Sequence, residues 1–284
     1  MGTPQATSTG LLGDTAERDY SRKLRLFNTF AAPELRQAIG TLGLKAGMRV
    51  LDAGCGTGEA LAWLQHEVAP TGAVVGVDLA TAHVSAARAA VPPDVQVLQA
   101  DLLQMPFPPA AFDAVWCTNT LHHLRDPLLG MRSLAGLLRP GGRLALGQSS
   151  LLPDMFFAWD ARLERLTNEA VRQYYRERYG VGERELAPVR ALLGLMRRAS
   201  LQDVSSRTFM IERITPLKEA DEAYLREAIF RDTWGGERLR PYLSAADHAE
   251  LMRLCDPQAA QFALRRPDFH FLQTFTVVVG RMPP

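Results

Sequence analysis

Three glycines, each separated from the next by one residue, form a segment of the kind that binds ligands. Gly54, Gly56 and Gly58 lie in the segment VLDAGCGTGEA, directly after an apolar run that is typical of a buried strand. Glycine has no Cβ and permits a positive φ. A ligand can therefore approach the backbone amides at the start of the helix expected from Gly58 to Val68. The sequence predicts a ligand site on this loop.

The spacing of the glycines narrows the class of ligand. A dinucleotide-binding loop reads G-x-G-x-x-G, whereas here the third glycine comes one residue early and Glu59 takes its expected place. This argues against a nicotinamide cofactor. A nicotinamide-dependent oxidoreductase stays an alternative, which fluorescence of the bound reduced cofactor would reveal. A Walker loop needs a lysine that this loop lacks, so phosphoryl transfer is not expected.

Two acids follow the next two apolar runs. Asp78, followed by Leu79, ends the run AVVGVD, where its carboxylate can accept hydrogen bonds from both hydroxyls of an unphosphorylated ribose. Asp101 follows VQVLQA and can accept from an exocyclic amine, while Leu102 packs on a flat base. Together with the glycine loop, these residues predict an adenosine site without a phosphate clamp. Capping a turn is the alternative role for Asp101. Asp52, which could contact the ligand through water or tie down its own loop, is left out of the site.

Short apolar strands alternate with helices around these residues, which is the pattern of βαβ units. Because the strands are apolar at nearly every position, we expect an α/β fold whose doubly wound parallel sheet is covered by helices on both faces. Helices are expected at Thr15 to Phe30 and from Pro33 to near Gly43, with helix-rich stretches at Pro153 to Tyr179 and Leu217 to Arg231. The expected strands are MRVLDAG, AVVGVDL, VQVLQAD, FDAVWCT, RLALGQSS, Val204 to Glu212 and Phe271 to Gly280.

Composition and charge exclude several classes of protein. The chain has 284 residues, of which 47% are apolar and 22% charged, enough for a large core. Its 32 basic residues nearly balance its 31 acidic residues, so no nucleic-acid partner is expected. No apolar run approaches the roughly 20 residues of a membrane span, and the polar start lacks the features of a signal peptide. We therefore expect a cytoplasmic protein without a membrane segment. Three scattered cysteines predict neither a disulfide framework nor a metal site.

These motifs, in this order, resemble those of class I S-adenosylmethionine-dependent methyltransferases, in the small-molecule group that includes the quinone-biosynthesis enzymes. VLDAGCGTG is similar to the first motif, VVGVDL to the second, QADLLQMPFPPAAFD to the third and LRPGGRLALG to the strand-entry motif that follows. The match covers roughly Leu44 to Ser149. It implies a Rossmann-like, mostly parallel sheet with a final antiparallel strand, which FLQTFTVVVG would supply.

The resemblance also implies that S-adenosyl-L-methionine is the cofactor. The glycines would bound its methionine end, the acid of the second strand would bind its ribose, and the acid of the third strand would bind its adenine. A residue just after the fourth strand would contact it through backbone groups, and an aromatic residue of the leading helix would close over it. By resemblance, the cofactor-binding residues are Tyr20, Gly54, Gly56, Gly58, Asp78, Leu79, Asp101, Leu102 and Asn119.

The loop WCTNTLHHL bears on the acceptor and on the chemistry. It lacks the [DNS]-P-P-[YF] run and the Pro-Cys pair of the family's DNA-methylating enzymes, which leaves a small molecule as the methyl acceptor.

His122 and His123 follow the fourth strand at the mouth of the cleft. An imidazole with a pKa of about 6.5 suits a general base for a phenol or alcohol. Adjacent side chains usually point apart, so at most one is expected to face the acceptor. The alternative is that both anchor the loop by hydrogen bonds.

Segments outside the motifs are expected to cap the cofactor and to roof the acceptor. We predict an N-terminal helical cap at 1–43, a cofactor-binding core at 44–150 and a helical lid at 151–184. Residues 185–284 would complete the sheet and carry a second helical insertion at about 213–270. Aromatic walls in the lid suit an apolar or aromatic secondary metabolite, and a homodimer contact is the alternative role for these rings. The lid residues singled out are Phe156, Trp159, Tyr174 and Tyr175.

The predicted function is therefore methyl transfer to an O, N or C atom of a small molecule. The alternative is a methyltransferase-like protein that uses bound S-adenosylmethionine for other chemistry or as a ligand-sensing regulator. Release of S-adenosylhomocysteine in the presence of an acceptor separates the two.

Overall fold

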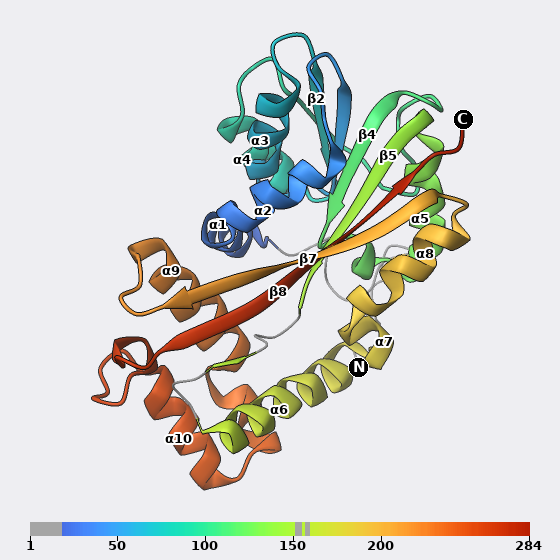
Figure 1. Ribbon diagram of the computed structural model, residues 1–284. Helices are drawn as coiled ribbons and strands as arrows, with labels where there is room; N and C mark the ends of the chain where they lie inside the picture. The colour runs from blue at the N-terminus through green and yellow to red at the C-terminus, as the bar shows by residue number, and fades with distance from the viewer. Residues whose placement is uncertain (1–18, 151–154, 157–159) are drawn as a thin grey trace.

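The computed structural model describes residues 19–150, 155–156 and 160–284, and their strands form one sheet (Figure 1). The strand order is β3-β2-β1-β4-β5-β8, with β7 paired to the outer side of β8 and β6 paired to β8 beyond the end of β5. Neighbours from β3 to β5 are parallel, and β8 is antiparallel to β5. The strands are β1 Arg49–Ala53, β2 Ala73–Asp78, β3 Gln96–Gln99, β4 Phe112–Thr118, β5 Leu138–Ser149, β6 Met155–Phe156, β7 Gln202–Ile214 and β8 His270–Arg281.

Helices cover both faces of the parallel strands. Along β1, Val50 packs with the cluster that includes α2, α3 and α4, whereas Leu51 packs with the cluster that includes α5 and α8. Trp116 and Val115 of β4 divide in the same way, which explains why these strands are apolar at consecutive positions. The helices of the core are α2 Ala32–Ile39, α3 Glu59–Val68, α4 Thr81–Ala90, α5 Pro127–Gly136 and α8 Leu192–Arg198, and the single turns are η1 Gly40–Leu42, η2 Leu121–His123 and η3 Pro188–Ala191.

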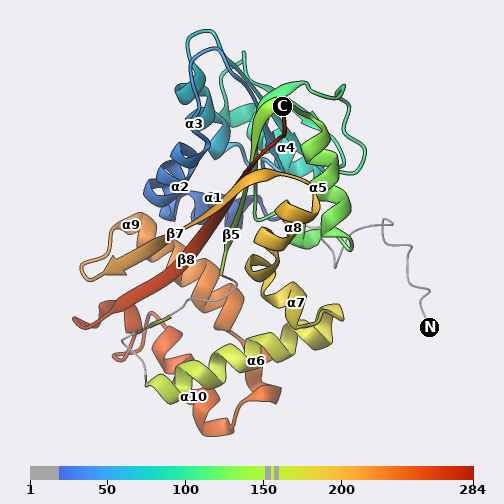
Figure 2. The ribbon, with the colours of Figure 1, turned by 45° about the vertical axis from the view of Figure 1, so that its right-hand side comes forward.

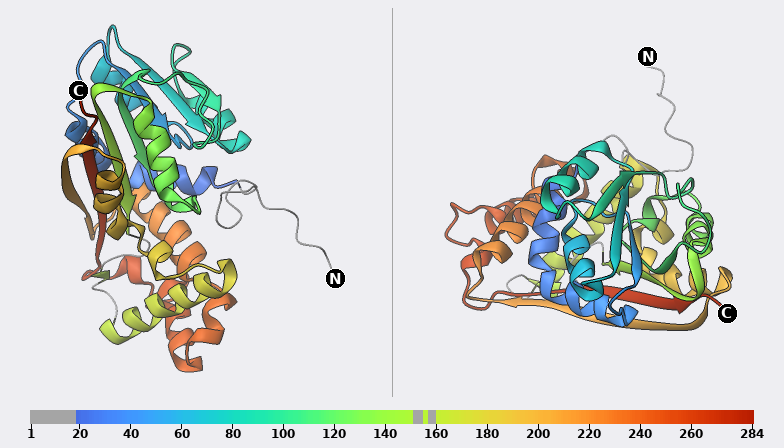
Figure 3. Two further views of the ribbon diagram at one scale, coloured as in Figure 1. Left: turned by 90° about the vertical axis from the view of Figure 1, so that its right-hand side faces the viewer. Right: turned by 90° about the horizontal axis from the view of Figure 1, so that it is seen from above.

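A second group of helices lies at one end of the molecule, away from α3 and α4, and the long strands β7 and β8 run from the core into it (Figures 1 and 2). Helix α1 lies between this group and the core (Figure 3). Phe230 and Phe262 of the group belong to the same buried cluster as Trp116 of the core, so the two parts share one hydrophobic interior. The remaining helices are α1 Ser21–Phe30, α6 Ala161–Tyr179, α7 Glu183–Leu186, α9 Glu219–Tyr224, the π-helix η4 Leu225–Trp234, η5 Glu237–Tyr242, α10 Ala245–Cys255 and η6 Ala263–Arg265.

An ion-pair network fastens β7 to its surroundings. The Arg213 guanidinium of β7 contacts Glu34 of α2 at 2.9 Å and Asp221 of α9 at 3.0 Å, and it donates to the carbonyl of Phe30. Its side chain is 13% exposed. Opposite charges held this far from water attract strongly, so the network links the leading helices, the sheet and the helical group.

The predicted mostly parallel sheet with a final antiparallel strand is confirmed, and β8 is the strand expected from FLQTFTVVVG. Two expectations were wrong. β5 begins at Leu138 rather than Arg143, because pairing with β4 continues across a register shift between Phe112 and Ala114. Met155–Phe156 form a strand inside a stretch expected to be helix-rich, because β8 extends past the end of β5 and offers another partner edge there. The part of the first expected helix that precedes residue 19 lies outside the described residues.

Among the described residues, no helix is long and apolar enough to cross a bilayer.

Candidate active site

The glycine loop between β1 and α3 packs closely against three neighbouring elements. The φ angles of Gly54, Gly56 and Gly58 are 81°, 53° and 92°. A Cβ on Gly54 would lie 2.2 Å from Oγ1 of Thr120, one on Gly56 would lie 3.1 Å from Leu24 of α1, and one on Gly58 would lie 3.1 Å from the backbone of α4. These positions therefore require glycine for the packing of the loop itself, as well as for the ligand access expected from the sequence.

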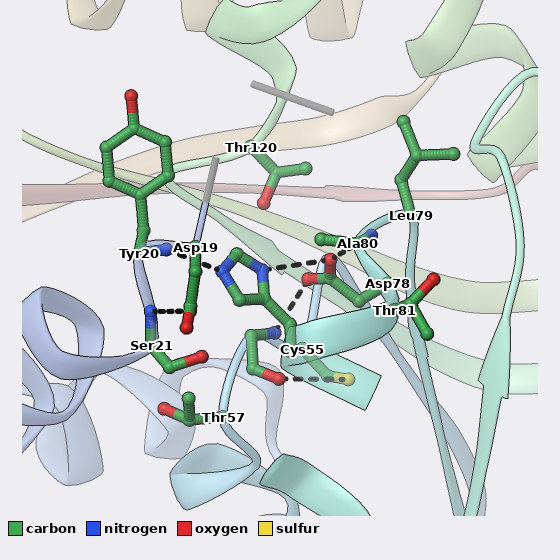
Figure 4. A network of polar contacts seen from close by, with 12 residues as sticks. Asp19, Tyr20, Ser21, Cys55, Thr57, Asp78, Leu79, Ala80, Thr81 and Thr120 are labelled. Atoms are coloured by element: carbon green, nitrogen blue, oxygen red, sulfur yellow. Dashed lines mark hydrogen bonds and ion pairs between the residues drawn. The ribbon is translucent and has the colours of Figure 1, made fainter. Parts of the chain in front are cut away.

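The Asp78 carboxylate at the end of β2 accepts three hydrogen bonds from the protein (Figure 4). Its Oδ2 accepts from the Gly56 N–H at 2.9 Å, and its Oδ1 accepts from the Ala80 N–H at 3.0 Å and contacts Nδ1 of His83 at 3.1 Å. A carboxylate has about four acceptor positions. About one is left for a ribose hydroxyl in this arrangement, rather than the two that the sequence interpretation assumed.

Asp52 lies beneath the same loop and is 2% exposed. Its Oδ2 is buried and makes no hydrogen bond with the described residues. The pKa of Asp52 is raised to about 8. Burial is the largest cause, and the nearby negative charges of Asp78 and Glu59 raise it further. A buried carboxyl with an unused oxygen suits a cationic group, such as the ammonium of S-adenosylmethionine. This part of the site therefore fits the cofactor that the motifs imply, and leaving Asp52 out of the site missed this property.

The residues expected to hold the base lie on the turn after β3. Oδ1 of Asp101 accepts from the Leu103 N–H at 2.9 Å, so this acid caps a turn, the alternative role considered for it. Leu102 is buried in the cluster beneath the turn, and the carbonyl of Leu79 accepts from the Gln99 side chain at 2.9 Å. Contact of Asp101 and Leu102 with an adenine stays a prediction, as does contact of Leu79, which follows β2, with the cofactor.

Asn119 and Tyr20 each join two elements near the site. Asn119, with a φ of 49°, turns the chain after β4. Its N–H donates to the Gly147 carbonyl at 2.8 Å, and its Oδ1 accepts from the Ser149 N–H at 2.8 Å, which fastens β4 to β5. Tyr20 precedes α1, and its N–H donates to Nε2 of His83 at 3.3 Å. Their contacts with a cofactor stay predictions.

The expectation that His122 and His123 point apart was wrong, because their ring centroids are only 3.9 Å apart. The 3₁₀ turn η2 tightens the chain after β4 and brings the two rings together. Nδ1 of His122 lies 3.0 Å from Oε1 of Gln148 at the end of β5. Desolvation lowers the pKa of His122 to about 4, and desolvation together with the neighbouring imidazoles lowers the pKa of His123 well below its usual value. Both rings are therefore neutral at pH 7.

An apolar pocket opens beside His122, between the ends of β4 and β5 and the helices α5 and α8. It holds about 520 Å³ of empty space, part of which is open to solvent, and its walls are mostly aliphatic. Among the described residues that line it, Glu185 is the only one with a carboxylate. The lining residues are Cys117, Leu121, His122, Leu124, Pro127, Leu146, Gly147, Gln148, Glu185, Pro188, Ala191, Leu192 and Leu195.

Among the four lid residues, Tyr174 and Tyr175 have described side chains, and neither is one of the described residues that line this pocket. Tyr174 and Tyr175 are partly buried against the shared hydrophobic interior, and the guanidinium of Arg238 lies 5.7 Å from the ring centre of Tyr174. Trp159 and the side chain of Phe156 lie outside the described residues. A lid role for these four residues stays a prediction.

The residues that sequence reasoning missed are His83, Gln148 and the helical wall of the pocket. Gln148 could have been noticed as a polar residue ending a strand at the ligand edge of the sheet. In the described part of the chain, no group of three or more His, Cys, Asp or Glu side chains is arranged to hold a metal ion.

Comparisons with known proteins bear on the core. Residues 51–146 match the family described as a methyltransferase domain. The chain is 40% identical over 119 residues to 27-O-demethylrifamycin SV methyltransferase of Amycolatopsis mediterranei, a match that covers 40% of this chain and 43% of that protein. It is 37% identical over 114 residues to the ubiquinone/menaquinone biosynthesis C-methyltransferase UbiE of Pseudomonas fluorescens, covering 38% of this chain and 44% of that protein.

The matched region thus spans less than half the length of these curated relatives. Among solved structures, a suspected methyltransferase of Bacillus halodurans C-125 superimposes with a TM-score of 0.53 at 19% identity, covering 89% of this chain and 100% of that one. This likeness shows that the fold extends beyond the matched sequence region.

Proposed function

We propose that this chain, in which residues 51–146 form a class I S-adenosylmethionine-dependent methyltransferase domain, transfers a methyl group to a small apolar or aromatic acceptor. The observation that carries the proposal is the shared sheet edge. The glycine loop and Asp78 lie at the ends of β1 and β2, and the apolar pocket with His122 lies at the ends of β4 and β5. A nucleoside site and an acceptor site on neighbouring strands suit group transfer between two bound molecules.

The residues that would hold the cofactor are the glycine loop, Asp52 and Asp78. When bound, S-adenosylmethionine supplies an electrophilic methyl group on its sulfonium. The ribose would use the acceptor position that remains on Asp78, and the ammonium would favour the ionised form of Asp52. Both acids lie beside the loop whose glycines allow close approach of a ligand.

The acceptor would occupy the apolar pocket with its nucleophilic atom toward His122. Because the oxygen of the Gln148 amide can only accept, the contact at 3.0 Å assigns the ring proton to Nδ1 and leaves Nε2 of His122 as the proton acceptor. The lowered pKa keeps Nε2 unprotonated at neutral pH, but it also makes this nitrogen a weak base. Positioning of the acceptor and exclusion of water would therefore contribute most of the rate.

The similarity to a methyltransferase named for an oxygen of rifamycin SV supports an oxygen atom of a secondary metabolite as the acceptor. The aliphatic lining of the pocket supports an apolar scaffold around that oxygen.

A labelled-methyl assay tests the proposal. The protein is incubated with methyl-labelled S-adenosylmethionine and a panel of hydroxylated aromatic and polyketide-like compounds, and labelled product and S-adenosylhomocysteine are quantified together. Equal amounts of both support methyl transfer. Cofactor binding without labelled product across the panel would favour the regulator alternative.

Two neighbouring leucines then test the pocket with the first accepted compound. Leu192 lines the pocket, whereas Leu193 is 38% exposed on the same helix. We expect Leu192→Trp to raise the acceptor KM about tenfold or more by filling the pocket, and Leu193→Trp to leave it within about twofold. Equal effects of the two variants would place the acceptor elsewhere.

A further inference from the structure

His83 is a buried imidazole that the proposed reaction does not use. It lies on the first turn of α4, is 6% exposed and is hydrogen-bonded at both ring nitrogens. Nδ1 contacts Oδ1 of Asp78 at 3.1 Å, and Nε2 faces the backbone nitrogen of Tyr20 at 3.3 Å. The ring therefore bridges these two groups, which belong to the residues labelled Asp78 and Tyr20 in Figure 4.

The two contacts fix the tautomer of the ring. A backbone N–H can only donate, so Nε2 of His83 accepts from Tyr20. The ring proton of the neutral imidazole is therefore on Nδ1, where it is donated to the Asp78 carboxylate. A hydrogen bond to an ionised acceptor is about twice as strong as one between neutral groups, so the contact with Asp78 is the stronger of the two.

We propose that His83 is a positioning residue of the nucleoside site, which orients the Asp78 carboxylate for the ribose and ties the amino end of α1 to it. This inference rests on the proposed function, because it assumes that a ribose binds at Asp78. The torsion that turns a carboxylate about its Cβ–Cγ bond is soft. Donors on both oxygens, from Gly56, Ala80 and His83, hold the carboxylate in one plane.

Tyr20 links His83 to the start of helix α1. This residue precedes α1, and Leu24, one turn later, is the neighbour that a Cβ on Gly56 would meet. Leu24 of α1 thus lies close to the glycine loop, and the residue that precedes α1 is hydrogen-bonded to His83. The His83 ring therefore couples the position of α1 to the orientation of the Asp78 carboxylate that would hold the ribose.

Three substitutions separate the two contacts of the ring. The amide nitrogen of His83→Asn can replace Nδ1 and donate to Asp78, but its side chain is too short to reach Tyr20. The longer His83→Gln can place its amide oxygen near the Tyr20 N–H, but it does not preserve the donor to Asp78. His83→Leu removes both contacts at similar volume.

The first measurement is calorimetric binding of S-adenosylhomocysteine and of methylthioadenosine to the full-length variants, with folding checked by urea denaturation. We expect His83→Leu and His83→Gln to weaken both ligands by about tenfold, the effect of one lost charge-assisted hydrogen bond. His83→Asn should stay within about threefold of wild type. Both ligands should lose affinity equally, because both carry the ribose.

The second measurement uses the ligand-free protein. Nitrogen NMR of the wild-type ring should show the proton on Nδ1, and hydrogen exchange should show the Tyr20 amide protected in wild type and His83→Gln but not in His83→Asn or His83→Leu. Unchanged or tighter ligand binding by folded His83→Leu would overturn the inference alone. Failure of folded wild type to bind either ligand would overturn the proposed function, and the inference with it.

Discussion

The raised pKa of Asp52 makes the stability of the protein depend on pH in a testable way. In the fold, this carboxyl keeps its proton up to about pH 8, whereas in the unfolded chain it loses the proton near its usual value of 3.8. A group whose pKa is raised by folding contributes its full stability below its unfolded pKa and loses that contribution as the pH rises toward its folded pKa. Wild type should therefore lose stability between pH 6.5 and 8 because of Asp52.

The size of this loss follows from the linkage between proton binding and folding. Each pH unit over which the folded state holds one more proton than the unfolded state lowers the free energy of unfolding by about 1.4 kcal/mol. From pH 6.5 to 8, with half ionisation at about pH 8, this amounts to about 1.5 kcal/mol. His122 and His123 have lowered pKa values and act in the opposite direction, mainly below pH 6.5.

Asp52→Asn is the matched control, because it has nearly the same shape and cannot titrate. Urea denaturation of both proteins at pH 6.5 and 8 gives the change in the free energy of unfolding for each, and the contributions of the other titrating groups cancel in the difference. We expect wild type to lose about 1.5 kcal/mol more than Asp52→Asn. Parallel behaviour of the two proteins would refute the assignment of a proton to buried Asp52.

Three further predictions concern the site and the interior. His122→Ala should lower turnover less than about tenfold, because the lowered pKa makes the imidazole a weak base, and a loss of about 100-fold at unchanged cofactor affinity would instead establish base catalysis. Arg213→Met should lower the free energy of unfolding measured in urea by about 3 kcal/mol, because it leaves the carboxylates of Glu34 and Asp221 without their cation. A change under about 1 kcal/mol would contradict this. Gly54→Ala should lower the free energy of unfolding by about 2 to 4 kcal/mol, because alanine disfavours the positive φ and its Cβ would collide with Thr120. Adding Thr120→Ala should recover part of that loss, whereas no recovery would place the strain in the backbone alone.

The sheet was predictable because strands that are buried on both faces show consecutive apolar residues in the sequence. Runs such as VLDA and AVWC are apolar at consecutive positions, and the structure buries Val50 and Leu51 on opposite faces. The last strand was predictable for the same reason. The short strand at Met155–Phe156 was not, because it depends on the length of β8 beyond β5, a property of the assembled sheet rather than of the segment.

The residues at the expected strand ends were enough to predict where the site lies, but not which hydrogen bonds form within it. Asp78 was expected to face two ribose hydroxyls, whereas the structure commits three of its acceptor positions to Gly56, Ala80 and His83. The contact between Asp78 and His83 joins residues five apart across a strand-to-helix turn. The other partner of His83, Tyr20, precedes a helix that is distant in the sequence, so no local pattern indicates these contacts. The pKa of Asp52 likewise depends on burial and on neighbouring charges, which only the fold brings together.

Calorimetric titration of S-adenosylmethionine into wild type and folded Asp78→Ala tests the cofactor site, because Asp78 joins the glycine loop to the proposed ribose site. We expect one-to-one binding by wild type. We also expect Asp78→Ala to lose about 1.5 to 3 kcal/mol of binding free energy, through removal of a charged acceptor and of the contact that orders the loop. Absence of binding by folded wild type, or equal affinity of the two proteins, would contradict a cofactor site at Asp78.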